Sequence, residues 1–240
     1  MVSKSVEYRV GQLETARVFT VSDLGFPIEN WENVRVKLGR MTRQGIIKKV
    51  GNGKFYKPEQ SVFGAVAPDS YELVKDLLIK DGVVDGYLTG YSVWNEMLLT
   101  TQISNTIVIG CNRRREPLTR GFYKVRFVLQ PNKITRGNIY LLQILDALKF
   151  LKTIPDTNLA ESVGRLNDII AELKATDLDV LIKLAFKYPP RVRALLGAIV
   201  ENIGMKEKVF GLRKTLNPAT TYKIGLQNEK CLNLKDWYII

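Results

Sequence analysis

The pattern of hydrophobic positions is clearest in one short segment of the N-terminal quarter. Val34, Leu38 and Met41 stand at i, i+4 and i+7, which places them on one stripe of an α-helix. Asn30 is a residue type that commonly caps a helix start, and Gly45 suits the left-handed conformation that follows a last helical turn. The segment therefore predicts an amphipathic helix whose opposite face is polar and basic.

The period of the pattern changes from helix to strand directly after this segment. Residues 46–50 alternate as a strand does, and residues 54–57 form the return strand. The Gly51-Asn52-Gly53 tip between them tolerates the positive φ angles that a tight hairpin requires. We expect a two-stranded antiparallel ribbon that follows the helix.

Two shorter helices are predicted upstream. The spacing of apolar residues indicates a first helix over residues 5–13, and a second, short helix that starts near Thr20 or Ser22 and ends at Gly25. Three helices followed by a ribbon are the plan of a winged helix-turn-helix, a module that commonly binds duplex DNA. We assign this domain to residues 1–60.

The rest of the chain, residues 61–240, mixes helical and strand patterns. A connector leads to a helix that begins near Pro68. The predicted strands cover residues 104–111 and 121–130, and the predicted helices after them cover residues 139–151, 159–174, 177–188 and 191–203. Short strands are expected in the tail at residues 222–226 and 236–240. The predicted fold class is α+β: the winged helix-turn-helix, then a larger α+β domain with a small sheet and a helix-rich C-terminal section.

The charge is unevenly distributed along the chain. The 240 residues carry a formal net charge of +12, and residues 1–58 hold 11 Lys or Arg against 5 Asp or Glu, a net +6 in a quarter of the length. A charged outer helix face is often only solvated surface. Here the excess lies on the helix and ribbon that would face phosphate groups, which favours nucleic-acid binding.

Composition removes several classes of function. Histidine is absent and the only cysteines are Cys111 and Cys231, which excludes Ser-His and Cys-His catalytic pairs, imidazole metal sites and any cysteine zinc or disulfide motif. We expect no enzymatic activity, no metal and no cofactor, and we expect Cys111, Trp94 and Trp237 to be core residues. No apolar run could span a membrane and no secretory signal is present, so we expect a cytoplasmic protein without a membrane partner.

The predicted DNA-binding residues lie on the basic helix and its ribbon. We expect three residues near the start of the helix to reach base edges in the major groove, two arginines further along to hold phosphates, and the wing to contact backbone or minor groove. In that order these residues are Asn30, Asn33 and Arg35; Arg40 and Arg43; and Lys48, Lys49, Asn52 and Lys54.

A second concentration of charge lies between the two predicted strands. It consists of Arg113, Arg114 and Arg115, with Arg120 a few residues further on. One interpretation is a solvated loop tip without a role. The other is contact with a phosphate backbone or an acidic partner protein, because guanidinium groups bind oxyanions well.

Five segments spread over nearly the whole chain carry a diffuse resemblance to a known family. They are residues 3–9, Val34 to Ile47 (VRVKLGRMTRQGII), Gly90 to Gln102 (GYSVWNEMLLTTQ), Pro190 to Gly197, and Leu216-Asn217-Pro218 with Tyr222. Together they resemble the bacterial AbiEi-type antitoxins and the DNA-binding proteins grouped with them. The chain departs from the commonest family pattern in carrying Leu98-Leu99 where a Leu-Gly pair is usual.

The resemblance implies a division of labour between two domains. The winged helix would bind inverted repeats in the protein's own promoter and repress it, and the C-terminal domain would counter a nucleotidyltransferase-like toxin in a type IV toxin–antitoxin pair. One alternative is a protein-interaction module whose winged helix docks a protein partner. A third hypothesis, a nucleotidyltransferase-like enzyme, is disfavoured because no paired Asp-x-Asp follows a Gly-Ser turn.

Overall fold

The computed structural model describes residues 2–62, 64–226 and 232–240, and it confirms an α+β fold with small sheets and a helix-rich C-terminal region. The chain divides into two compact units. The first comprises Met1–Leu78 with Pro117–Val125, and the second comprises Ile79–Glu116 with Arg126–Ile240. Each unit is described separately below.

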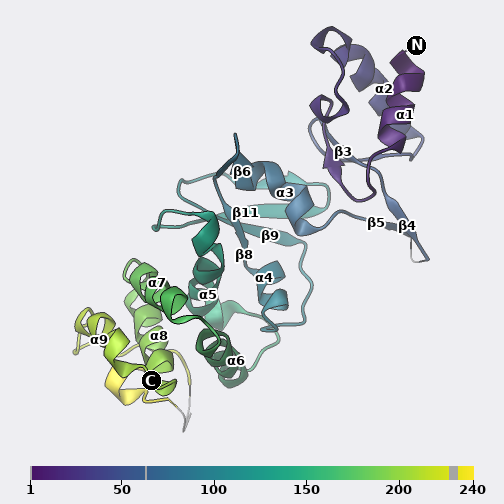
Figure 1. Cartoon of the computed structure of the whole chain (residues 1–240). Coiled ribbons are helices and arrows are strands. Elements are labelled where there is room, and N and C mark those ends of the chain that lie inside the picture. The colour runs from purple at the N-terminus through teal and green to yellow at the C-terminus, as the bar shows by residue number, and fades with distance from the viewer. Residues whose placement is uncertain (1, 63, 227–231) are drawn as a thin grey trace. The chain divides into compact units, whose positions relative to one another are not determined.

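The first unit begins with two helices that pack side by side, α1 (Val2–Gly11) and α2 (Trp31–Arg43) (Figure 1). The predicted stripe of Val34, Leu38 and Met41 is confirmed, because all three side chains are buried against Val6 and Val10 of α1. Burial of this stripe fixes which face of α2 remains in solvent. The opposite face of the helix is therefore available to a ligand.

The two ends of α2 are built differently. Gly45 has a φ of 75° and its N–H donates to the Thr42 carbonyl oxygen at 3.1 Å, so the predicted left-handed helix end is confirmed. At the start, Asn30 occupies the N-cap position, but its side chain makes no capping hydrogen bond. The expected side-chain cap is wrong because Asn30 already belongs to a preceding 3-10 turn, Ile28–Asn30 (η2), whose backbone leads directly into the helix.

The predicted second helix is a single 3-10 turn, Ser22–Leu24 (η1). Gly25 ends it in the left-handed conformation, with a φ of 65°, as expected. Pro27 follows two residues later and donates no backbone hydrogen bond, so too few residues remain for a longer α-helix. Four helical segments, α1, η1, η2 and α2, therefore precede β2 in the described chain, and α1 and α2 are the long ones.

The wing is a three-stranded antiparallel sheet with the order β1-β3-β2. Its strands are β1 (Val18–Phe19), β2 (Lys48–Gly51) and β3 (Lys54–Tyr56), with a register irregularity between Lys49 and Gly51. Gly53 has the expected positive φ, 65°, at the tip. The following connector holds an exposed hairpin of β4 (Glu59–Ser61) and β5 (Gly64–Val66).

The first unit extends beyond the predicted boundary at residue 60. It includes α3 (Ser70–Leu78), β10 (Leu118–Arg120) and the beginning of β11 (Tyr123–Leu129). Polar contacts tie α3 to the winged helix: Glu72 accepts a hydrogen bond from the Val18 N–H at 2.8 Å, and Asp76 pairs with Lys54 at 3.3 Å. These contacts join residues far apart in sequence, which is why no local pattern placed the boundary after α3.

The second unit contains a small sheet with helices beside it (Figure 1). In this unit β11 neighbours β9 (Thr106–Cys111), which pairs with β8 (Tyr87–Thr89), and a short ribbon is formed by β6 (Ile79–Lys80) and β7 (Val83–Val84). Between β8 and β9 lies α4 (Tyr91–Glu96), whose Trp94 is buried as expected. Cys111 is a buried core residue, as predicted, whereas Cys231 lies outside the described residues.

The C-terminal section is helical. It comprises α5 (Ile139–Phe150), α6 (Leu159–Ala171), α7 (Ala175–Ala185), α8 (Pro190–Asn202) and α9 (Lys206–Lys214), with 3-10 turns at Arg136–Asn138 (η3), Leu151–Thr153 (η4) and Lys235–Trp237 (η5). The sequence did not predict α9, because its residues are largely charged and only two of them are buried. The predicted tail strands are wrong: one isolated parallel bridge joins Tyr222 and Ile239, and Trp237 fills the core instead.

A buried polar network lies beneath the sheet of the second unit. Asp146, on α5, accepts hydrogen bonds from the hydroxyls of Tyr87 at 2.7 Å and Tyr188 at 2.8 Å. The Gln130 side-chain amide donates to both tyrosine oxygens, at 2.8 and 2.7 Å. Burial raises the pKa of Asp146 above its usual range, against the lowering effect of the two hydroxyl donors. The network connects β8, α5, the residue that follows β11 and the turn between α7 and α8.

Candidate nucleic-acid interface

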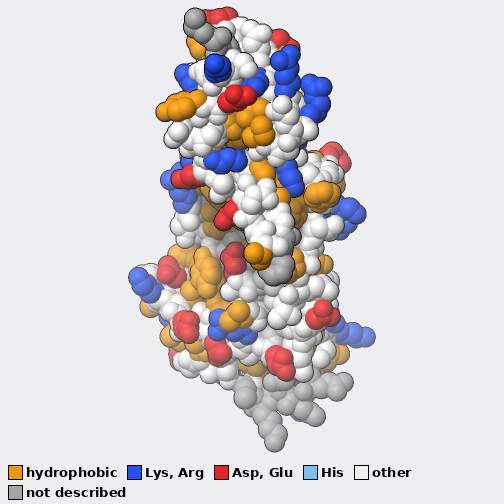
Figure 2. Space-filling view, turned by 90° about the vertical axis from the view of Figure 1, so that its right-hand side faces the viewer, with side chains coloured by type: hydrophobic (Ala, Val, Ile, Leu, Met, Phe, Trp, Pro, Cys, Tyr) orange, Lys and Arg blue, Asp and Glu red, His pale blue; other side chains and the backbone are white. Residues whose placement is uncertain are grey.

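The outward face of α2 is polar and exposed along the whole helix. Asn33, Arg35, Arg40 and Arg43 are all exposed, and the apolar Val36 stands among them with 48 % of its surface accessible. At about 1.5 Å per residue this helix is roughly 20 Å long, which suits insertion into a groove of duplex DNA. Several Lys and Arg side chains stand out on the face that Figure 2 presents.

Arg35, one of the residues predicted to reach base edges, has an acidic and an aromatic neighbour. Its guanidinium lies 3.6 Å from the Glu32 carboxylate and 5.8 Å from the centre of the Trp31 ring. The side chains of Arg35 and Glu32 are 57 % and 79 % exposed, so water screens the pair and little free energy holds it. Arg35 can therefore exchange Glu32 for a base or phosphate at small cost.

The two predicted phosphate-binding arginines differ from Arg35 in having no acidic neighbour. Arg43 donates only a long hydrogen bond, 3.5 Å, to the carbonyl oxygen of Gly39. Within the described parts of the chain neither Arg40 nor Arg43 forms an ion pair. Their positive charges are uncompensated locally, which is the state in which an anion is bound most readily.

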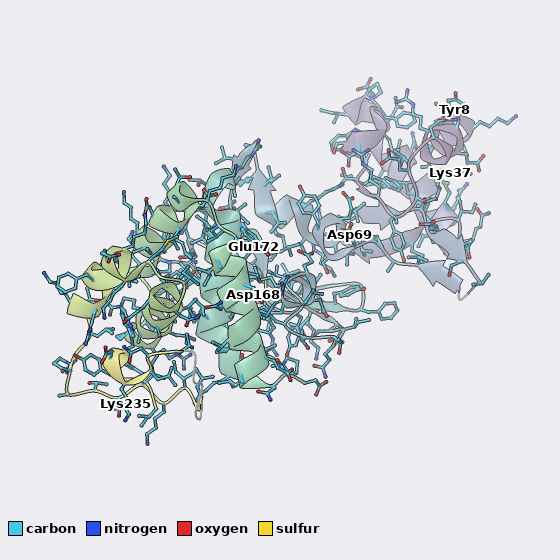
Figure 3. The ribbon with its side chains drawn as sticks, turned by 60° about the horizontal axis from the view of Figure 1, so that its bottom comes forward. Tyr8, Lys37, Asp69, Asp168, Glu172 and Lys235 are labelled. Carbon is cyan, nitrogen blue, oxygen red and sulfur yellow. The ribbon has the colours of Figure 1, made fainter. Side chains whose placement is uncertain are left out.

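Lys37 lies on the flank of the same helix, and its charge is not free to bind an anion. Its side chain turns toward α1 and forms an ion pair with Glu7 (Figure 3). Only 15 % of the Lys37 side chain is exposed. The residue therefore helps to hold α1 against α2 and leaves the outward face to the arginines.

The predicted polar residues at the start of α2 differ in exposure. Asn33 is exposed on the first turn of the helix, as base contact requires. Asn30 is only half-buried and sits in the 3-10 turn that precedes the helix, with its side chain unused for capping. Within the described residues, neither side-chain amide forms a hydrogen bond. DNA would therefore have no intramolecular partner to displace at Asn30 or Asn33.

The wing carries the remaining predicted contacts. Lys48 and Lys49 are exposed neighbours on β2, and Asn52 is exposed at the tip. Among the residues that the structure describes, these two lysines form no ion pair. Lys54 is different, because its ammonium group lies 3.3 Å from the Asp76 carboxylate and only 19 % of its side chain is exposed.

Arg120 does not join the other three arginines in one cluster. It belongs to the first unit, is 8 % exposed, and donates to the Asp76 carboxylate at 2.8 Å. The same carboxylate oxygen of Asp76 therefore pairs with both Arg120 and Lys54, so one negative charge faces two positive charges. Arg120 also lies so close to Gly51 that a Cβ on this glycine would stand 2.9 Å from a guanidinium nitrogen.

Arg113, Arg114 and Arg115 lie in the second unit, in the loop after β9. Arg113 pairs with Asp85 at 2.8 Å, and Arg115 forms an ion pair with the same carboxylate while its guanidinium stands 5.4 Å from the centre of the Phe127 ring. Arg114 is exposed. The loop is thus anchored by its outer arginines, and Arg114 is the one that projects.

The residue that sequence reasoning missed is Asp76. It is the shared acidic partner of a wing lysine and of a buried arginine, and it comes from a helix outside the predicted winged-helix domain. A carboxylate on the exposed side of an amphipathic helix gives no signal in one sequence that it will bind two distant cations. The sequence gives one indirect signal. If Lys54 and Arg120 are partly buried, their charges require an acidic partner somewhere in the chain.

Two further properties bear on the class of function. No group of His, Cys, Asp and Glu among the described residues is arranged to hold a metal ion. Over the same residues, no helix combines the length and the apolar character that crossing a membrane requires.

Comparisons with known proteins bear on the fold. No family model matches the chain, and no curated protein matches it. A solved structure, the crystal structure of the RV2827C protein from Mycobacterium tuberculosis, is similar with a TM-score of 0.64 and 12 % sequence identity. The match covers 99 % of this chain and 90 % of that chain. At this level of identity the likeness shows the fold alone.

Proposed function

We propose that this protein is a DNA-binding transcriptional regulator that contacts duplex DNA through α2 and the wing. The observation that carries the proposal is the set of four exposed cations without an acidic partner in the described chain, Arg40, Arg43, Lys48 and Lys49, on the outward side of one winged helix. Protein cations that neutralise phosphates release bound counterions, which supplies most of the affinity for duplex DNA.

Sequence recognition in this proposal comes from the first half of α2. Arg35 forms two hydrogen bonds with a guanine, and Asn33 reads an adenine edge or a nearby phosphate. The exposed Val36 packs against a thymine methyl group, which gives its apolar surface a partner. Asn30 is the third proposed base contact, and Asn52 contacts the backbone or the minor groove from the tip of the wing.

The regulator is proposed to be the antitoxin of a type IV toxin–antitoxin pair. In that role the winged helix represses the protein's own promoter through inverted repeats, and the C-terminal region counters a nucleotidyltransferase-like toxin. The support is the resemblance of several segments to AbiEi-type antitoxins. The projecting Arg114, with the anchored Arg113 and Arg115, is the proposed contact for an acidic surface of the toxin.

The DNA proposal is tested by fluorescence anisotropy with the full chain. One labelled duplex carries the region upstream of the gene, and a second has the same composition in shuffled order. We expect tighter binding to the upstream duplex. Arg35→Ala should weaken that binding by roughly 1–3 kcal/mol and leave the shuffled duplex almost unaffected, because a bidentate guanine contact is lost.

Arg17 provides a matched control for this substitution. It also pairs with a glutamate three residues away, at 3.5 Å, and its side chain is likewise 57 % exposed, but it lies outside α2. Arg17→Ala should leave both affinities unchanged. Equal binding to the two duplexes by the unmodified chain, or equal losses for Arg17→Ala and Arg35→Ala, would contradict sequence recognition through α2.

A further inference from the structure

The first unit contains an open cavity that the proposed DNA contacts do not explain. It has a volume of about 460 Å³ and lies between β2, the start of α3 and the turn that joins β10 to β11. Sites for small molecules commonly have volumes of roughly 300–1,000 Å³. Its apolar walls include Ile47, Val50 and Leu73, which are buried, and Phe122, which is 92 % exposed. A ligand with an apolar body could cover that phenylalanine.

The charge of the cavity wall is one-sided. Lys48, Lys49 and Arg120 line it, and no carboxylate does. Asp76 compensates Arg120 from outside the lining, and the two lysines have no acidic partner in the described chain. Like charges around a low-dielectric wall focus a positive potential into a cleft. The cavity therefore favours a ligand that carries a negative group.

Two tyrosines add hydrogen-bonding groups to this wall. Tyr56, on β3, and Tyr123, on β11, both line the cavity. Burial, reinforced by the neighbouring Tyr123, raises the pKa of Tyr56, so its hydroxyl keeps its proton at neutral pH and can donate to an anion. Apolar walls with a few converging polar groups are the usual composition of a small-molecule site.

We propose that this cavity binds a small amphipathic carboxylate, with its apolar body against Val50, Leu73 and Phe122 and its carboxylate at Lys48 and Lys49. A second part of the inference rests on the proposed function. Because the same two lysines are the wing's phosphate contacts, the bound carboxylate and DNA compete for them. The ligand then acts as an effector that weakens DNA binding.

The binding step is tested without DNA, by isothermal titration calorimetry of the full chain with cinnamate and with the uncharged cinnamyl alcohol. We expect saturable binding of one cinnamate per chain. Cinnamate should bind about tenfold more tightly than the alcohol, because each of the two exposed lysines adds only a weak ion pair with the carboxylate. Replacing both Lys48 and Lys49 by alanine should abolish the preference for the anion. Alanine at the exposed Lys80 and Lys124, which do not line the cavity, should leave it unchanged.

The position of the ligand is tested in two ways. In the unmodified chain, amide chemical-shift changes on cinnamate addition should be confined to the segments that line the cavity, residues 42–50, 56, 67–73 and 120–123. Ala67→Trp, at an exposed position of the lining, should fill the cavity and reduce binding at least tenfold. Absence of saturable binding, equal affinity for cinnamate and the alcohol, or shifts located elsewhere would overturn the assignment.

The competition step uses DNA and is scored separately. Saturating cinnamate should weaken binding of the upstream duplex to the unmodified chain, and Ala67→Trp should remove this effect. If cinnamate binds and DNA affinity does not change, the effector role is overturned while the cavity assignment stands. If the chain fails to bind DNA in the absence of cinnamate, the proposed function fails, and the calorimetric result still decides the cavity.

Discussion

The salt dependence of DNA binding gives the sharpest test of how the first unit uses its charges. The perturbation is the double substitution of Lys48 and Lys49 by alanine. In the described chain Arg40, Arg43, Lys48 and Lys49 have no acidic partner, whereas Lys37 and Lys54 are each held by a carboxylate. We therefore count four phosphate contacts for each bound chain.

The expected magnitude follows from counterion release. Four contacts at about −0.9 each give a log–log slope of roughly −3.6 for affinity against salt concentration. Raising salt from about 50 to about 200 mM should then weaken binding about 150-fold for the unmodified chain. With two contacts left, the slope falls to about −1.8 and the same change in salt weakens binding only about twelvefold.

The assay is anisotropy with a shuffled duplex, because phosphate contacts do not depend on sequence. Alanine at the exposed lysines Lys80 and Lys124 serves as the control and should leave the slope unchanged. A slope that is the same for the unmodified chain and the Lys48/Lys49 variant would refute the reasoning. It would mean that the wing lysines do not meet phosphate, whatever the affinity of the complex.

Further predictions concern the stability of the second unit. Because burial raises the pKa of Asp146, the folded chain keeps the carboxyl proton at pH values where the unfolded chain has lost it. The stabilisation from this group should therefore be highest below the pKa of Asp in the unfolded chain, about 3.9, and should fall as the pH rises toward the pKa in the folded chain. Urea unfolding followed over pH should show the fall, and a profile for Asp146→Asn that keeps it would contradict the assignment. Gly197→Ala should destabilise by about 1–3 kcal/mol, since its Cβ would stand 2.1 Å from the Trp237 ring. Gly164→Ala, in α6 with no atom within 4 Å of the added Cβ, should stabilise by about 0.5–1 kcal/mol in the same denaturation assay, and equal effects of the two substitutions would refute the packing argument.

The features predicted from sequence are those encoded by neighbouring residues. The buried stripe of α2 is a local property of three residues one turn apart, and the turn at Gly53 depends on the backbone freedom of that residue alone. Both were recovered. Strands β9 and β11 and the helices from α5 to α8 were recovered within a few residues for the same reason, whereas the short strands β6, β7 and β8 were not predicted.

What could not be predicted depends on contacts between distant segments. Asp76 has two cationic partners that are distant in the sequence. The hairpin of β4 and β5 lies between Lys54 and Asp76, and the strands β6 to β9 lie between Asp76 and Arg120. Asp146 lies on a predicted apolar helix, and its partners, among them the hydroxyls of Tyr87 and Tyr188, come from distant segments. Trp237, in the tail, was expected in the core, but the alternation of hydrophobic residues does not show that its ring packs against Gly197.

The shared carboxylate on α3 has a consequence for how the binding surface can change over evolutionary time. Replacing Asp76 by a neutral residue would remove the acidic partner of a lysine and an arginine together, so the net charge of the first unit would rise by one in a single step. The residues proposed to read bases would remain unchanged. The proposed DNA affinity that does not depend on sequence can thus change independently of the proposed sequence preference. Asp76 lies on α3, whereas the residues proposed to read bases lie at the start of α2.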